Sequence, residues 1–309
     1  MKRTKMTRRA RNNINGFLFA LPWIIGFTCF SIYPLLASLY YSFSSFNAVT
    51  DPKWVGLANY QNILKDMLVW KSLKNTLFMA FVSTPINLCL AVCMAYIVNK
   101  SFRGKGAART IFFMPSIIPV VASTMIWIWM FDPTYGMINT ALHWFGIQGP
   151  AWLNNPQFTK WALLLMGSWN TGTTMLICLA ALQDVPMSYY ESAQLDGANA
   201  FQIFFRITLP NIAHILVYQA ILNVINAFQY FTQVYVIITA NSGVKNTTTS
   251  GGPANSILMY PLYIFYNAFS YMKMGKASAM AWLLFIIIAI LTAIMVKVTR
   301  KTSEVAGSE

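Results

Sequence analysis

Six long runs of apolar residues alternate with short polar segments along the chain. They cover residues 16–43, 76–98, 111–131, 160–182, 212–240 and 279–298. Each run has about 20 residues or more, which is the length an α-helix needs to cross roughly 30 Å of bilayer hydrocarbon. The pattern therefore predicts an all-α membrane protein with six transmembrane helices.

A seventh apolar run, Ile257–Phe269, is too short to be a span, and Pro261 interrupts it. Charge supports the count of six. With six spans both termini lie in the cytoplasm and all eight arginines of the chain fall on that side, as the positive-inside rule requires. A seventh span would move Arg300 outside, so we expect Ile257–Phe269 to be an external or interfacial helix.

Composition agrees with a membrane protein, because 57% of the residues are hydrophobic and only 10% are charged, against about 25% in soluble domains. The net charge of +14 comes from residues at the ends of the apolar runs, where anionic headgroups explain it better than nucleic acid does. Residues 1–15 and 299–309 are predicted to be cytoplasmic tails of the transmembrane domain 16–298. The four cysteines all lie in apolar runs and suggest neither disulfides nor a zinc site.

The sequence offers little for catalysis or for ion coupling. None of the eight carboxylates lies in the middle of a span, whereas a proton- or sodium-coupled carrier usually needs an ionisable group there. This disfavours a secondary carrier or channel but leaves it open, since backbone carbonyls also bind sodium. There is no G-x-x-x-x-G-K-[ST] loop for nucleotide phosphates. Neither histidine has a partner cluster, so we predict no enzyme activity and no metal site.

One segment of mixed polarity, residues 186–210, separates the fourth and fifth runs. Ser188 stands three residues before Glu191, the spacing of a capping box, which predicts a short helix beginning at Ser188. Gly197 is expected to end that helix, because glycine adopts the left-handed conformation without a steric penalty. A second short helix is expected to follow, with Pro210 limiting its continuation. The segment thus predicts two short helices joined by a turn.

This segment resembles the EAA loop of binding-protein-dependent ABC importers, specifically the carbohydrate permeases of the maltose type. The matching positions are Glu191, Ala193, Asp196, Gly197, Ala198, Phe204, Ile207, Leu209 and Pro210. Ser192 departs from the family, which more often has alanine there. Two more strings are similar to the family's, namely Val55-Gly56-Leu57-Ala58-Asn59-Tyr60 and Gly251-Gly252-Pro253-Ala254-Asn255. Among such permeases, the chain most resembles those for plant-derived, pectin-type (rhamnogalacturonan) oligosaccharides of firmicutes.

The resemblance implies the type I ABC importer permease fold, with cytoplasmic coupling helices, in a bacterial plasma membrane. It also implies four partners: a second, similar permease, two cytoplasmic ATPase subunits, an extracytoplasmic solute-binding protein, and the oligosaccharide. ATP and Mg would be bound by the ATPase, and no cofactor by this chain. The positions that would couple to the ATPase are Glu191, Ser192, Ala193, Asp196 and Gly197.

Polar residues recur in the fifth run at steps of three and four. They are Asn223, Asn226, Gln229, Tyr230 and Gln233, and on a helix they would share one face. An unpaired amide costs several kcal/mol in hydrocarbon, so this face should meet protein or a water-filled cavity. The face either bonds to neighbouring helices or lines a sugar pathway, and we favour the pathway. Trp169 and Asn170 in the fourth run offer similar chemistry.

Overall fold

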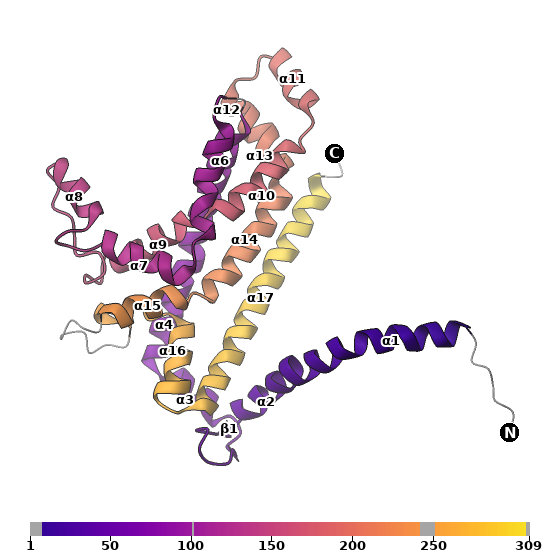
Figure 1. Ribbon diagram of the computed structural model, residues 1–309, viewed down its shortest axis with the longest axis vertical. Coiled ribbons are helices and arrows are strands. Elements are labelled where there is room, and N and C mark those ends of the chain that lie inside the picture. The colour runs from indigo at the N-terminus through magenta and orange to yellow at the C-terminus, as the bar shows by residue number, and fades with distance from the viewer. Residues whose placement is uncertain (1–7, 101, 242–250, 307–309) are drawn as a thin grey trace. The chain divides into compact units, whose positions relative to one another are not determined.

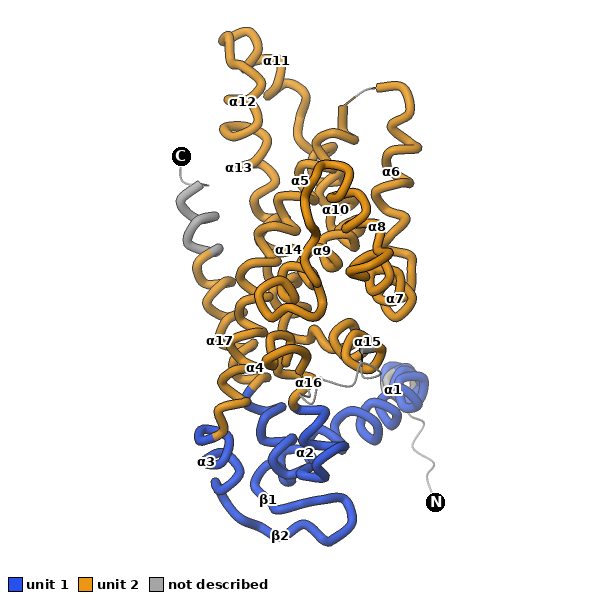
Figure 2. Tube along the Cα trace, turned by 90° about the vertical axis from the view of Figure 1, so that its left-hand side faces the viewer, with its two compact units in different colours: residues 1–65, 264–283 blue, residues 66–263, 284–309 orange. Residues whose placement is uncertain are grey.

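The computed structural model describes residues 8–100, 102–241 and 251–306, most of them helical (Figure 1). Residues 1–7 of the predicted N-terminal tail and 307–309 of the predicted C-terminal tail lie outside the described residues. The chain divides into two compact units (Figure 2). Unit 1 comprises Met1–Lys65 with Ile264–Leu283, and unit 2 comprises Asp66–Tyr263 with Leu284–Glu309.

The helices fit six membrane spans. Four are long and apolar enough to cross a bilayer by themselves: Asn15–Ser42, Met67–Asn99, Ala213–Ala240 and Met274–Val298. Two pairs also pass when each is taken as one bent span: Lys105–Ile117 with Val120–Met130, bent by 100°, and Thr159–Trp169 with Gly172–Gln183, bent by 50°. Over the described residues the protein is therefore an all-α membrane protein, as the apolar runs predicted.

Unit 1 contains the first span and the segment that follows it. Its elements are α1 (Arg8–Phe27), the π-helical turn η1 (Thr28–Ile32), α2 (Tyr33–Ser42), β1 (Ser44–Ser45), β2 (Lys53–Trp54), α3 (Ala58–Lys65), the π-helical turn η6 (Tyr266–Ser270) and the start of α17 (Met274–Ala306). The two strands pair antiparallel. Asn59 Nδ2 donates to the carbonyls of Ser42 and Ser44, each at 2.9 Å. The Val55–Tyr60 string therefore ties the segment after the first span back onto the end of that span.

Unit 2 holds the second to fifth spans and the rest of α17. Its elements are α4 (Met67–Phe78), the π-turn η2 (Met79–Ser83), α5 (Thr84–Asn99), α6 (Lys105–Phe113), the 3₁₀ turn η3 (Met114–Ile117), α7 (Val120–Met130), α8 (Met137–Trp144), α9 (Thr159–Trp169), α10 (Gly172–Gln183), α11 (Met187–Leu195), α12 (Ala200–Ile203), the π-turn η4 (Phe204–Thr208), α13 (Leu209–Asn211), α14 (Ala213–Phe228), α15 (Thr232–Asn241), the 3₁₀ turn η5 (Pro253–Asn255) and α16 (Tyr260–Phe265). Small buried residues such as Ala91, Ala95 and Cys178 let α5 and α10 pack closely in its core.

Three prolines of the helices follow π-helical turns. Pro34, Pro85 and Pro210 each follow by two residues the end of a π-turn, namely η1, η2 and η4. A proline cannot donate to the preceding turn, and its ring collides with the carbonyl four residues earlier. In all three cases that carbonyl belongs to the wider π-turn, where the collision is relieved. The expectation that Pro210 limits its helix is confirmed, since the helix ends at Asn211, one residue later, and Ile212 is not helical.

The segment Ile257–Phe269 is helical from Tyr260 onward, in α16 and η6, and its end is exposed at Phe269, but its first residues are buried. Ile257, Leu258, Met259 and Tyr260 are at most 1% exposed. Asn75 Nδ2 of α4 donates to the carbonyls of Asn255 at 2.9 Å and Leu258 at 3.0 Å. These bonds hold non-helical backbone inside the protein, which is why its apolar side chains face protein rather than lipid.

Replacing Asn75 with leucine should lower the thermal stability of the protein in detergent. The substitution removes the side-chain donor from both carbonyls; that of Asn255 keeps only the N–H of Leu258 at 3.3 Å, and an unsatisfied buried group costs about 1–3 kcal/mol. Asn154→Leu is the control, because Asn154 is exposed in the segment between α8 and α9. A melting temperature for Asn75→Leu equal to that of the control would contradict this role of Asn75.

Candidate functional site

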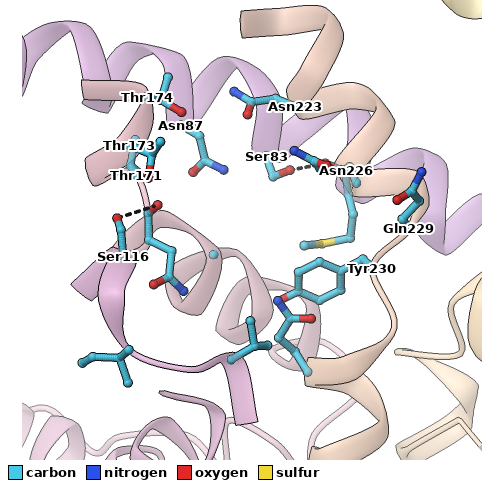
Figure 3. A pocket seen from close by; sticks show the side chains of 17 residues that line it. Ser83, Asn87, Ser116, Thr171, Thr173, Thr174, Asn223, Asn226, Gln229 and Tyr230 are labelled. Carbon is cyan, nitrogen blue, oxygen red and sulfur yellow. Dashed lines mark hydrogen bonds between the residues drawn. The ribbon is translucent and has the colours of Figure 1, made fainter. Parts of the chain in front are cut away.

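A cavity of about 370 Å³ lies within unit 2 (Figure 3). Its walls come from both bent spans, from the π-turn of the second span and from the fifth span. The lining residues are Met79, Ser83, Asn87, Ser116, Ile118, Val120, Gly167, Asn170, Thr171, Thr173, Thr174, Asn223, Asn226, Ala227, Gln229, Tyr230 and Gln233. None of these side chains is charged, and most carry an amide or a hydroxyl.

The cavity lies where the helices are interrupted. The π-turn Met79–Ser83, the bend at residues 117–120, the bend at 169–172 and the break at 229–231 all contribute lining residues. Irregular backbone at membrane depth is tolerated only where it is buried in protein or borders a water-filled space. Three breaks in the spans and one π-turn therefore border the same cavity.

A glycine brings two of these interruptions together. A Cβ on Gly172 would lie 2.6 Å from the Phe112 carbonyl oxygen and 2.7 Å from Ser116 Oγ. Only glycine allows α10 to begin so close to the end of α6. Ser116 Oγ also donates to the carbonyl of Asn170 at 3.4 Å, a long hydrogen bond between the two bends (Figure 3). One wall of the cavity is thus built by direct backbone contact.

All five residues of the polar face predicted in the fifth run line the cavity, and Asn170 joins them. They do not lie on one uninterrupted helix as expected. The helix ends at Phe228 and resumes at Thr232, so Gln229 and Tyr230 lie in the break (Figure 3). Trp169 is not among the lining residues: its ring packs edge-on against Trp127, with 5.6 Å between ring centroids. Trp169 is the last residue of α9, and at this helix break its side chain and that of Asn170 have different surroundings.

The sequence interpretation missed half of the polar lining, namely Ser83, Asn87, Ser116, Thr171, Thr173 and Thr174. A signal for two of them was present, because Ser83 and Asn87 are four residues apart in an otherwise apolar run. The threonines gave no such signal, since a hydroxyl in a membrane helix is normally satisfied by the carbonyl of the preceding turn.

Two polar groups of the cavity are buried and have no hydrogen-bond partner among the residues that the structure describes. They are Asn223 Nδ2 and the Tyr230 hydroxyl. Buried polar groups are almost always paired, so these two are available to a molecule inside the cavity. Amides and hydroxyls donate and accept without formal charge. The cavity is suited to an uncharged molecule rich in hydroxyl groups.

A second candidate region is the segment between α10 and α14. Its first helix, α11, ends in a Schellman motif: the N–H of Ala198 donates to the carbonyl of Ala193 at 2.9 Å, and that of Gly197 to Gln194 at 3.1 Å. Gly197 has φ +78°, the left-handed conformation that this motif requires. The prediction that Gly197 ends the helix is confirmed.

The predicted capping box at Ser188 and Glu191 is wrong. Helix α11 begins at Met187, and Pro186 is its N-cap, with no side-chain hydrogen bond. Because the N-cap is two residues earlier than predicted, Ser188 lies inside the helix and cannot adopt the extended conformation of a cap. A capping box does exist at the second helix, where Asn199 and Gln202 bond to each other's backbone N–H at 2.9 Å. The N-x-x-Q spacing was visible in the sequence.

The surface of α11 is mostly exposed. Of the five predicted coupling positions only Ala193 is buried, and Glu191, Ser192, Asp196 and Gly197 are exposed. The apolar Leu195 is 90% exposed. The following helix is anchored to the core instead: the ring of Phe204 packs edge-on against Tyr96 of α5, with 5.1 Å between centroids. The exposed helix α11 is thus followed, after a short turn, by a segment that packs on the core.

Residues 87–304, more than two thirds of the chain, match the family described as the binding-protein-dependent transport system inner membrane component. The chain belongs to this family. The family resemblance drawn from the three sequence strings is therefore confirmed, and with it the prediction of a permease component of an ABC importer.

Individual relatives cover nearly the whole permease. It is 40% identical to the probable ABC transporter permease protein YesP of Bacillus subtilis, over 96% of this chain and 93% of that protein. It is 31% identical to the trehalose/maltose transport system permease protein MalF of Thermococcus litoralis, over 92% and 93% of the two chains. A crystal structure of a bacterial alginate ABC transporter matches with a TM-score of 0.77, at 19% identity, over 96% of this chain and 97% of that one. This last likeness supports the fold.

Proposed function

We propose that this permease passes an oligosaccharide through the cavity of Figure 3, in an importer powered by separate ATPase subunits. The observation that carries the proposal is the position of an uncharged polar cavity at three helix breaks and a π-turn. Membrane transporters bind their substrates where transmembrane helices are discontinuous. The volume of about 370 Å³ falls within the range of small-molecule sites.

The chemistry of the lining favours a sugar. Sugar hydroxyls need partners that both donate and accept, as Asn223, Asn226 and Gln233 do. The aromatic ring of Tyr230 provides an apolar face beside them. The names of relatives such as the trehalose/maltose permease support the same substrate class. Which oligosaccharide is carried, including the pectin-type fragments suggested by the sequence, stays a prediction.

The coupling segment supplies the connection to ATP. The exposed face of α11, with Glu191 and Asp196 beside the apolar Leu195, is suited to dock in a groove of another protein. A push on α11 would reach the core through the contact between Phe204 and Tyr96. ATP and Mg would be held by the two ATPase subunits, and this chain would transmit their closure.

The remaining partners follow from the same proposal. A second, similar permease would complete the transmembrane part, and an extracytoplasmic binding protein would deliver the sugar. Both termini would be cytoplasmic in the plasma membrane, because Lys100, Arg103 and Arg109 follow the second span and mark the cytoplasmic side.

The test is uptake by the full complex, reconstituted in proteoliposomes with its second permease, its ATPases and its binding protein. We expect labelled oligosaccharide to accumulate only with ATP and the binding protein present, and the binding protein to stimulate ATP hydrolysis. Uptake that continues without the ATPase subunits and follows a sodium or proton gradient would overturn the proposal in favour of a secondary carrier.

A further inference from the structure

A second cavity, of about 400 Å³, lies within unit 1. It is formed by the segment between the first and second spans and by the residues at the start of α17. The lining residues are Ser45, Phe46, Asn47, Thr50, Asn59, Asn62, Met272, Lys273, Gly275 and Lys276. They include two lysines and three asparagines, and none of them is acidic. We refer to this cavity as the lysine pocket.

The walls of the lysine pocket are fixed by hydrogen bonds. The N–H of Gly275 donates to the carbonyl of Phe46 at 3.0 Å, and a Cβ on Gly275 would overlap the Ser44 carbonyl oxygen. In the next part of the same segment, Asn47 Oδ1 accepts from the N–H groups of Val49 at 3.1 Å and Thr50 at 2.9 Å. Because these bonds hold the pocket in shape before anything binds, binding costs little conformational entropy of the pocket residues.

The order of the spans puts this pocket outside the cell, given the orientation proposed above. Residues 43–66 follow the first span, and Met272 and Lys273 immediately precede the last one. One span separates residues 43–66 from the basic cluster at Lys100 and Arg103. Since that cluster lies in the cytoplasm, the lysine pocket opens to the outside, where a binding protein must dock.

Two ammonium groups beside neutral amides and hydroxyls form an environment for carboxylate groups. We propose that the lysine pocket receives an acidic segment of the extracytoplasmic binding protein and so anchors it on this permease. This inference rests on the proposed function. A carboxylated sugar is the less suitable occupant. The cavity of Figure 3 has no cationic side chain among its lining residues that could pair with the carboxylate of such a sugar during transport.

The test is a double charge reversal, Lys273→Glu with Lys276→Glu, in the reconstituted importer. The measured quantity is the concentration of binding protein that gives half-maximal stimulation of ATP hydrolysis. We expect this concentration to rise at least about 10-fold, the effect of placing like charges across an interface, and the rate at saturation to stay similar. Lys53→Glu is the matched control, an exposed lysine of the same segment that does not line the pocket. Equal half-maximal concentrations for the double variant and the control would overturn the inference.

A second measurement needs no variant. Lysines of the wild-type complex are labelled with an amine-reactive reagent and quantified by mass spectrometry. Added binding protein should shield Lys273 and Lys276 and leave Lys53 reactive. Shielding by a free uronic-acid oligosaccharide, and none by the binding protein, would overturn the inference. Failure of the proposed function looks different, because the wild-type complex itself would then show no stimulation of ATP hydrolysis by the binding protein.

Discussion

Replacing Gly197 with valine should abolish ATP-driven uptake while the permease still assembles in the membrane. Gly197 has φ +78°, and a Cβ added to it would have no atom within 4 Å. The expected effect therefore comes from backbone conformation and not from a steric clash. A β-branched residue strongly resists positive φ, at about 1–3 kcal/mol for a strained residue. The Schellman turn would open, and α11 would lose its direction relative to the helix anchored by Phe204.

Two controls separate coupling from stability. Gly197→Asn should retain most of the uptake, because asparagine tolerates the left-handed conformation. Gly146→Val imposes the same kind of strain, since Gly146 has φ +74° and also has open space around it, but it lies just after α8, far along the chain from the coupling segment. It should leave uptake near the wild-type level. Uptake is compared at equal amounts of permease in the membrane. An equal loss of uptake for Gly146→Val and Gly197→Val would contradict a coupling role of Gly197.

The spans themselves were predictable, because length and hydropathy are what bilayer hydrocarbon selects. Their ends were less so. The second span was expected to begin at residue 76, but its helix begins at Met67. The first turns of α4 contain Lys71 and Lys74, and these charged residues made the apolar run appear to begin only after them. A side-chain cap starts the helix there, with Asp66 accepting from the N–H of Leu68 at 2.9 Å.

The interruptions inside the spans could not be placed from the sequence. Proline marks some of them, but Pro34 and Pro85 stay within continuous helices, where each follows a π-turn. Whether a proline bends, ends or merely widens a helix depends on packing around the freed carbonyl. At Pro119 the backbone instead turns extended and α7 starts anew. Local sequence does not distinguish these outcomes.

The same limit applies to the cavity. Spacing of three and four residues was enough to group Asn223, Asn226 and Gln233, because helical periodicity holds on either side of a short break. It was not enough for Trp169, whose neighbour Asn170 lines the cavity while its own ring contacts Trp127. At a helix break, adjacent residues are directed by the bend rather than by the periodicity of a helix.

The double substitution Asn226→Leu with Gln233→Leu should lower the rate of oligosaccharide uptake by about 10- to 100-fold. Each amide that bonds to the substrate contributes about 0.5–1.5 kcal/mol, and every 1.4 kcal/mol corresponds to a tenfold change. The fold should be affected much less, because Asn226 is exposed and Gln233 is only partly buried. Uptake and the melting temperature of the purified complex are measured together.

Tyr218→Leu provides the matched control on the same helix, since Tyr218 is 54% exposed and does not line the cavity. It should transport at close to the wild-type rate. The competing explanation is that the amides only hold helices together. In that case the double variant would lose protein yield and thermal stability, and the surviving protein would discriminate among oligosaccharides as the wild type does. A selective loss of rate at normal stability is expected only if the amides contact the sugar.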